Sequence, residues 1–138
     1  LNDKLRDDSK DNLIPIVFDQ ITKGSSPNIF GGDYPTHDGT AIRDYIHVLD
    51  VSSAHVAAVD FLLRGGGSQT LNIGTGVGTS VLEIVSEIIL QLGSNLAPNY
   101  TNRREGDVGK VVADPTKAEE ILYFRAKRTL SEIVASLL

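Results

Sequence analysis

The chain has 138 residues, a formal net charge of −5 and no cysteine. This length predicts one domain with a substantial core. The acidic balance argues against a nucleic-acid partner or an acidic membrane surface, both of which favour a basic face. The lack of cysteine excludes disulfides, zinc–thiolate sites and thiol nucleophiles. No apolar run approaches a membrane span and no secretory signal is visible, so we expect a soluble, cytoplasmic protein that binds no membrane.

The chain begins at Leu1 and contains no methionine, so we expect it to be a processed or truncated piece of a longer protein. Residues 1–11 hold seven charged side chains and show no apolar periodicity. This composition predicts a flexible segment. We therefore assign the folded domain to residues 12–138.

A first helix is predicted to begin at Asn12 or Leu13, because Pro15 suits the first helical turn. Apolar residues at positions 14, 17, 18 and 21 follow the helical spacing, and Gly24 ends the helix. From the residues alone, Asn12 is interpreted as a helix cap. The free N–H groups at a helix N-terminus favour phosphate, so a cap at this position is compatible with ligand binding.

The most informative stretch runs from Asn28 to Asp50. A short apolar run is followed by a long series of turn-forming residues. Residues 42–48 then alternate between apolar and polar, as on a half-buried strand. A long polar loop inside a compact chain is usually functional or disordered. Because this loop leads into a strand that carries Arg, Asp, Tyr and His, we interpret it as a binding wall.

The next helix is predicted to be capped by Asp50 and to end at the glycines of residues 65–67. Its expected apolar stripe consists of Ala54, His55, Ala58, Phe61 and Leu62. We interpret His55 as a histidine at the edge of the core. A metal site built from His47, His55 and Asp50 would match no zinc signature, so none is predicted.

Residues 69–78 superficially resemble a phosphate-binding loop, with a short strand at 71–73 that leads into glycines. The spacing is GxGxG, however, and not GxGxxG. No acidic residue follows at the required distance, and the lysine of a P-loop is absent. We therefore predict a structural strand and turn.

Capping signals predict three more helices. The first has a capping box of Ser80 and Glu83 and ends at Gly93. The second begins with Asp114 as the cap and Pro115 at the first position, and ends near Leu122. The third is a C-terminal helix with a capping box of Thr129 and Glu132. A short strand is predicted at residues 98–102.

The segment from Arg103 to Asp107 allows two interpretations. Adjacent arginines in a loop are usually solvated. A guanidinium group is also a planar fork suited to phosphate or carboxylate, and a nearby aspartate could hold ribose hydroxyls.

Five short motifs occur together and in order: NLIP at 12–15, NIFG at 28–31, DGT at 38–40, RDYIHV at 43–48 and RREGD at 103–107. With these motifs, residues 12–138 resemble the C-terminal, substrate-binding part of the UDP-glucose 4-epimerases (UDP-galactose 4-epimerases), an extended short-chain dehydrogenase/reductase family. RDYIHV alone would indicate only the wider superfamily. The resemblance implies an α/β fold with small sheets and no complete Rossmann sheet.

The resemblance also implies an isomerase of galactose metabolism. In that family, NAD takes a hydride from C4 of the sugar and returns it to the other face. The NAD-binding half and the catalytic Tyr and Lys are expected before Leu1. We therefore predict no catalytic, cofactor-binding or metal-binding residue in this chain, and no epimerase activity of the chain alone. The longer protein is expected to be a homodimer.

The role implied for this chain is to bind UDP-glucose and UDP-galactose. The residues carried over from the family as substrate-binding are Asn12, Leu13, Asn28, Ile29, Phe30, Arg43, Arg104, Glu105, Gly106 and Asp107. Residues 28–30 would line the uridine, Arg43 and Arg104 would meet the diphosphate, and Asp107 would contact the nucleotide. Arg43 could instead pair with Asp44 or Asp50.

Val111 matches a specificity gate where some family members have Tyr and others a small residue. A small gate implies that UDP-N-acetylhexosamines are also accepted.

Tyr123 and Lys127 have the Tyr-xxx-Lys spacing of the catalytic pair in short-chain reductases, but they lie between two C-terminal helices with no cofactor domain around them. We therefore predict that they are not catalytic.

Two alternatives stay open. The chain could belong to another NAD-dependent nucleotide-sugar epimerase, dehydratase or decarboxylase. It could also be a standalone, non-catalytic UDP-sugar-binding module.

If the helix after Asp50 and the segment near Leu71 normally pack against a cofactor half, the chain alone should expose apolar surface there and tend to associate.

Overall fold

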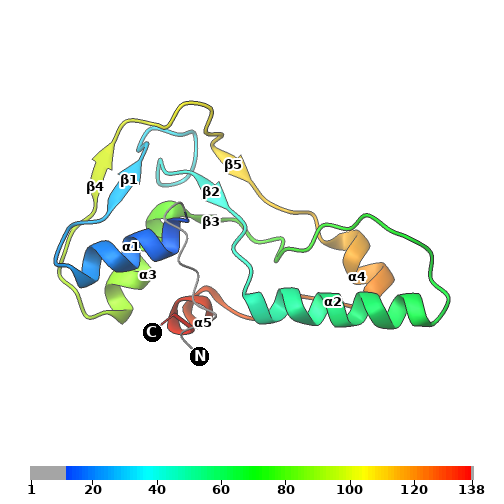
Figure 1. Cartoon of the computed structure of the whole chain (residues 1–138). Helices are drawn as coiled ribbons and strands as arrows, with labels where there is room; N and C mark the ends of the chain where they lie inside the picture. The colour runs from blue at the N-terminus through cyan, green and yellow to red at the C-terminus, as the bar shows by residue number, and fades with distance from the viewer. Residues whose placement is uncertain (1–11, 138) are drawn as a thin grey trace.

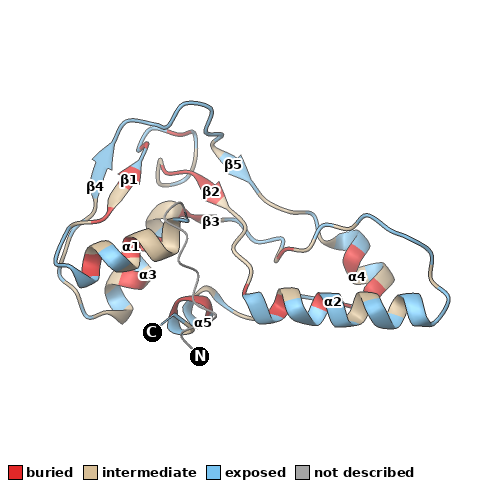
Figure 2. Cartoon of the chain, in the orientation of Figure 1, coloured by how far each residue is buried: buried red, intermediate tan, exposed pale blue. Residues whose placement is uncertain are grey.

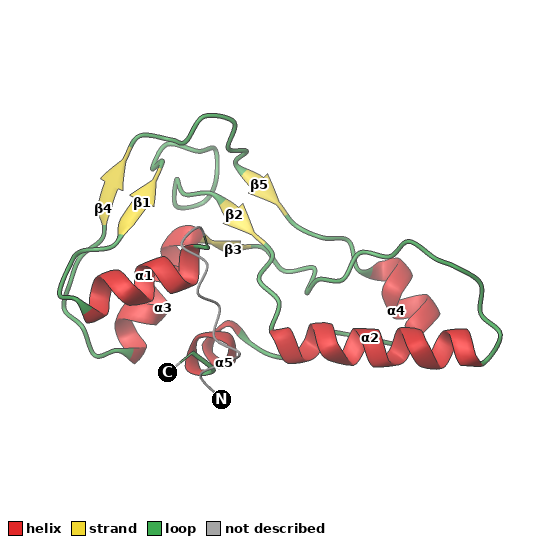
Figure 3. Ribbon diagram, viewed as in Figure 1, coloured by secondary structure: helices red, strands yellow, loops and turns green. Residues whose placement is uncertain are grey.

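Helices and short strands are interspersed along the computed structural model, which describes residues 12–137 (Figure 1 and Figure 3). The helices in this range are α1 (Leu13–Thr22), α2 (Val48–Leu63), α3 (Val81–Gln91), α4 (Thr116–Leu122) and α5 (Leu130–Ala135). The strands are β1 (Asn28–Phe30), β2 (Ile42–Arg43), β3 (Thr79–Ser80), β4 (Asn99–Thr101) and β5 (Lys110–Val111). The charged segment predicted at residues 1–11 lies outside the described residues.

The strands form two small sheets (Figure 3). β1 runs parallel to β4, with Asn28 opposite Asn99 and Phe30 opposite Thr101. β2 lies between β3, which is antiparallel to it, and β5, which is parallel. No larger sheet occurs within residues 12–137, so the predicted α/β fold without a complete Rossmann sheet is confirmed.

The main core is formed by α1, α3, α5 and β1. Its buried side chains are Val17, Ile21, Ile29, Ile84, Val85, Ile88 and Val134. α3 forms as predicted, because Ser80 and Glu83 make a capping box: the Ser80 hydroxyl accepts from the Glu83 amide at 3.0 Å, and the Glu83 carboxylate accepts from the Ser80 amide at 2.6 Å. The helical spacing then turns one apolar face of α3 into the core.

α2 and α4 form an arm that extends away from the main core (Figure 1). A second, smaller cluster of Ala54, Leu122 and Phe124 lies between them. Most of α2 faces outward (Figure 2), and its exposed apolar side chains are Val48, Leu49, Val56, Val59, Leu62 and Leu63. The predicted exposure of apolar surface on this helix is therefore confirmed, whereas the association it would cause stays a prediction. No helix within residues 12–137 has both the length and the apolarity to cross a bilayer.

Two predictions for α2 are wrong. The helix begins at Val48, and its cap is His47, whose Nδ1 accepts from the Leu49 amide at 3.0 Å. Asp50 lies inside the first turn and is buried. His55 and Leu62, expected in the buried stripe, are exposed, because only the narrow side of α2 that faces α4 is covered.

The strand predicted at residues 71–73 is also wrong, since no strand is formed there. A strand needs a hydrogen-bonded neighbour, and neither small sheet extends to this segment. The capping box predicted at Thr129 and Glu132 is confirmed. The prediction that Asp114 caps α4 is wrong, because α4 begins one residue later than expected and Pro115 is at the capping position; Asp114 Oδ1 still accepts from the Thr116 amide.

Asp50 joins the arm to the main core. Its carboxylate accepts from the amides of Lys127 and Arg128, at 3.2 and 3.0 Å, and from Arg128 Nη1 at 2.5 Å. Burial acts to raise the pKa of Asp50, but these hydrogen bonds outweigh it and hold the pKa below its ordinary value. The ionised carboxylate therefore stabilises the fold.

Replacing this carboxylate should weaken the fold. Asp50→Asn places an N–H group among three donors, so we expect a loss of about 2–3 kcal/mol at pH 7, below the usual range for a buried pair because Arg128 is 34% exposed. Because the folded pKa is lowered, this contribution is present above the unfolded pKa of about 3.9 and is lost as the pH falls through the folded pKa. Urea unfolding of both proteins between pH 3 and 7 measures the difference, which should shrink below about pH 4.

Asp60→Asn is the matched control, because Asp60 forms an exposed ion pair with Arg64 on the same helix. Its stability should stay within about 0.5 kcal/mol of wild type. Equal effects of the two substitutions at pH 7, or a difference as large at pH 3 as at pH 7, would contradict the anchoring role of Asp50.

Candidate functional site

Three of the segments predicted to bind a ligand, residues 28–30, Arg43 and residues 104–107, meet where the two sheets lead into long loops (Figure 1). Phe30 ends β1, and the turn at residues 104–107 follows β4. Because β1 and β4 are parallel, the segments that follow them leave from the same end. Arg43 on β2 pairs in register with Val111 on β5, the strand that follows this turn.

Arg104 stacks on Phe30, with its guanidinium carbon 4.0 Å from the centre of the ring. Both side chains are exposed. Within residues 12–137, no carboxylate oxygen lies within 4.0 Å of the Arg104 guanidinium nitrogens. The ring thus orients the cation while its N–H edges can still meet a phosphate or carboxylate.

Arg43 links β2 to the same loop. Its Nη1 donates to the carbonyls of Ile42 and Val108, both at 2.9 Å, and its Nη2 lies 3.7 Å from Asp107 Oδ1. The expectation that Arg43 could instead pair with Asp44 or Asp50 is wrong, because both carboxylates have other partners. The Nη1 edge of the Arg43 guanidinium therefore holds the loop through the Val108 carbonyl. The Nη2 edge makes only a long contact with Asp107, so it can still meet a ligand.

The turn between Arg104 and Asp107 is closed by the Asp107 amide, which donates to the Arg104 carbonyl at 3.3 Å. Gly106 has a φ of +81°, in the left-handed region that favours glycine. Glu105 and Gly106 are exposed at the tip of the turn. A side chain at position 106 would strain the backbone that presents Arg104.

The remaining predicted residues have different surroundings. Ile29 is fully buried in the core, so only its backbone could reach a ligand, whereas Asn28 is half-buried and Phe30 is more exposed. Asn12 and Leu13 lie at the start of α1, where they line a separate pocket of about 370 Å³ against Tyr45 and α5. Asn12 is at the capping position, but its side chain makes no capping hydrogen bond.

Tyr45 is a candidate that the sequence analysis did not single out. Burial raises the pKa of Tyr45 to about 12, while the charge of Arg43 acts in the opposite direction. Its hydroxyl is therefore neutral at physiological pH, and its ring lines the pocket with Leu13 and packs against the main core. The strand predicted at residues 42–48 included this tyrosine in the binding wall, although only Ile42 and Arg43 form a strand in the structure.

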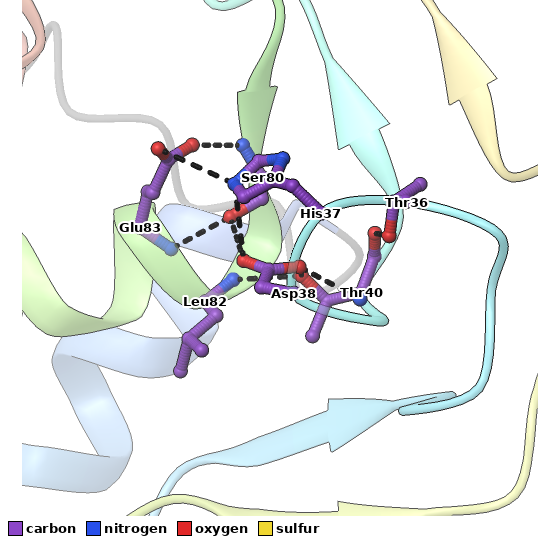
Figure 4. Close-up of polar contacts among 7 residues, drawn as sticks. All are labelled: Thr36, His37, Asp38, Thr40, Ser80, Leu82 and Glu83. Carbon is purple, nitrogen blue, oxygen red and sulfur yellow. Dashed lines mark hydrogen bonds and ion pairs between the residues drawn. The ribbon is translucent and has the colours of Figure 1, made fainter.

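The loop at residues 31–41 is anchored by the DGT motif (Figure 4). Asp38 accepts from the Ser80 hydroxyl and from both the amide and the hydroxyl of Thr40, and the Thr40 hydroxyl accepts from the Leu82 amide at 3.2 Å. Burial acts to raise the pKa of Asp38, but the hydrogen bonds from Ser80 and Thr40 lower it below its ordinary value. Asp38 and Thr40 therefore hold the loop against the start of α3.

The glycine-rich segment has a structural role, as predicted. The amides of Thr75 and Gly76 donate to Asp44, each at 3.0 Å, and the Thr75 hydroxyl donates to the same carboxylate. These N–H groups are therefore not available to a phosphate. Tyr123, of the Tyr-xxx-Lys pair, is 86% exposed at the end of α4. α4 lies on the arm, away from β1 and β4 (Figure 1).

Comparison with known proteins confirms the resemblance. The family model described as GDP-mannose 4,6 dehydratase matches residues 4–137. The UDP-glucose 4-epimerase of Rhizobium leguminosarum bv. trifolii is 44% identical over 126 residues, which are 91% of this chain and 38% of the relative. The chain thus spans well under half the length of this curated relative.

Two solved structures are similar in both fold and sequence. The UDP-glucose-4-epimerase of Stenotrophomonas maltophila, with bound NAD and formylated UDP-arabinopyranose, has a TM-score of 0.89 and 40% identity over 96% of this chain and 40% of its own. The enzyme from Bifidobacterium longum, in complex with NAD+ and UDP, has a TM-score of 0.81 and 36% identity over 92% of this chain and 38% of its own. The chain therefore belongs to the GDP-mannose 4,6-dehydratase family, in which it is similar to part of the UDP-glucose 4-epimerases.

Proposed function

We propose that this chain is the UDP-sugar-binding part of a UDP-glucose 4-epimerase, which interconverts UDP-glucose and UDP-galactose by transient oxidation at C4. One observation carries the proposal: Arg43, Phe30 and the turn at residues 104–107 lie together. Within this group, Arg104 has no acidic partner among the described residues. Similarity to epimerases crystallised with UDP or a UDP-sugar supports it.

The chemistry of these groups suits a nucleoside diphosphate. Arg104 and the open edge of Arg43 would neutralise the diphosphate, because a guanidinium fork pairs with two phosphate oxygens at once. The backbone of residues 28–30 and the ring of Phe30 would border the uridine, and Asp107 would accept from the nucleotide hydroxyls. Asn12 and Leu13, which line the pocket beside Tyr45, would also contact the UDP-sugar.

The described residues do not fit NAD. Their two small sheets provide no dinucleotide crevice, and Asp44 already occupies the amides of the glycine-rich segment. Relatives with bound NAD support the use of this cofactor by the longer protein. We assign its binding, and the catalytic Tyr and Lys, to a half that would precede residue 1.

Arg104→Ala should weaken the binding of UDP by the chain. A charge-assisted hydrogen bond contributes about 1.5–3 kcal/mol, so we expect Kd to rise about tenfold to a hundredfold. Salt should weaken binding to wild type more than binding to the variant, because the variant lacks one cation. Isothermal titration calorimetry with UDP at low and moderate salt measures both effects.

Arg125→Ala is the control, because Arg125 is an exposed arginine paired with Glu119 on the arm. It should bind UDP as wild type does. A wild-type chain that binds no UDP would refute the proposed function, and equal losses in both variants would show that net charge and not the site determines affinity.

The chain alone should not epimerise UDP-glucose, because we assign the nicotinamide site and the catalytic pair to the half that would precede residue 1. The longer protein, supplied with NAD, should convert UDP-glucose to UDP-galactose, as followed by chromatography of the sugar nucleotides. A 4-keto-6-deoxy product would instead identify a 4,6-dehydratase. Turnover by the 138-residue chain would contradict the division of roles.

Val111 should set substrate range in the longer protein. It is 51% exposed on β5, opposite Arg43 in the sheet, and a valine there leaves space that a tyrosine would fill. We expect the longer protein to turn over both UDP-glucose and UDP-N-acetylglucosamine, and Val111→Tyr to lower kcat/KM for the acetylated substrate alone by about tenfold or more. Val111→Ala is the matched control and should keep both activities. Turnover confined to UDP-glucose in wild type would contradict this role.

A further inference from the structure

Arg103, which precedes Arg104, is already bound within the protein. Its Nε lies 2.6 Å from Asp33 Oδ1, and its Nη2 donates to the Asp33 carbonyl. Its guanidinium carbon lies 4.1 Å from the centre of the Tyr34 ring. Asp33 and Tyr34 belong to the loop after β1, whereas Arg103 belongs to the loop after β4. These contacts therefore join the two loops that border the Phe30–Arg104 stack (Figure 1).

The ring of Tyr34 is packed tightly between the two loops. Tyr34 is only 5% exposed. A Cβ on Gly31 would lie 2.5 Å from the Tyr34 ring and 2.8 Å from Arg103 Cγ, and one on Gly109 would lie 3.3 Å from the ring. Only glycine at position 31 permits this approach, so the backbone next to Phe30 is held close to Arg103.

The loop at residues 31–41 thus has two anchors of different kinds. Asp38 and Thr40 hold its far end through buried hydrogen bonds to the start of α3 (Figure 4). The Asp33–Arg103 pair holds the end next to Phe30, and its side chains are 75% and 41% exposed. An exposed ion pair adds little to global stability, so the second anchor acts mainly on local geometry.

We propose that Arg103 is a positioning residue for the nucleotide site. From the loop after β4 it binds Asp33 and Tyr34 in the loop after β1, and these contacts hold the ring of Phe30 against Arg104. This inference rests on the proposed function. The two adjacent arginines then have different roles, because Asp33 already neutralises Arg103 while Arg104 has no acidic partner among the described residues.

A double-mutant cycle in the 138-residue chain tests the proposal. Asp33→Ala, Arg103→Ala and the double variant are titrated with UDP by calorimetry. Their stabilities are compared by urea unfolding. Hydrogen–deuterium exchange of residues 28–41 is followed in the absence of nucleotide. Arg64→Ala and Asp60→Ala are controls, because they remove a similar exposed pair on α2.

Arg103→Ala should bind UDP about tenfold more weakly. Asp33→Ala should lose less, because the Asp33 carbonyl and the Tyr34 ring can still hold Arg103. The double variant should bind no more weakly than Arg103→Ala, because the ion pair is already lost in that variant. Urea midpoints should stay close to wild type, while residues 28–41 exchange faster. Arg103→Lys should restore only part of the affinity, since an ammonium group cannot offer the planar fork that donates to both the Asp33 carboxylate and the Asp33 carbonyl, and it cannot stack on Tyr34 as a plane.

Unchanged UDP affinity in Arg103→Ala would overturn the proposal. Tighter binding in Asp33→Ala would overturn it too, because it would show that a released Arg103 binds phosphate itself. If the wild-type chain binds no UDP, the proposed function fails. The exchange data then decide separately: faster exchange in Arg103→Ala supports the joining of the two loops, and unchanged exchange refutes it.

Discussion

Hydrogen bonds to three aspartates on either side of β2 hold this structure together. Each carboxylate accepts from a segment that is distant in the sequence: Asp38 from Ser80, Asp44 from residues 75–76, and Asp50 from residues 127–128. The strands are only two or three residues long, so backbone ladders contribute few hydrogen bonds. Charge-assisted bonds are about twice as strong as neutral ones, and here they connect what the short sheets cannot.

The partners that these aspartates already have within the protein determine which arginines at the candidate site are free to bind a ligand. Because Asp44 and Asp50 are occupied elsewhere, neither neutralises Arg43, which lies between Asp38 and Asp50 in the chain. Asp33 is bound to Arg103, which leaves Arg104 stacked on Phe30 without a carboxylate partner among the described residues. Although the chain has a net charge of −5, one guanidinium group at this point therefore has no carboxylate partner among the described residues. That group can pair with a diphosphate in spite of the overall charge.

The predictions from the sequence were correct for features that depend on residues close together in the chain. The capping boxes at Ser80 and Thr129 depend on residues three positions apart, and both form. The predictions failed where a distant partner decides. Asp50 has a good capping side chain, but Lys127 and Arg128 take its carboxylate, so His47 caps α2 instead. Residues 71–73 have strand-like composition but no neighbouring strand.

The candidate site shows the same division. The motifs that contain Phe30, Arg43 and Arg104 predicted segments that the fold does bring together. The partner of Arg43 and the roles of Arg103 and Tyr45 depend on contacts between the two loops or with the core, which spacing alone does not reveal.

The most direct test of this account is a map of where UDP binds, from changes in the amide NMR spectrum of the chain during a UDP titration. The account predicts the largest shifts at residues 28–31, 43–45 and 104–107, with little change at residues 74–76, whose amides are bound to Asp44. A spectrum unaffected by UDP, or shifts centred on the glycine-rich segment, would contradict it.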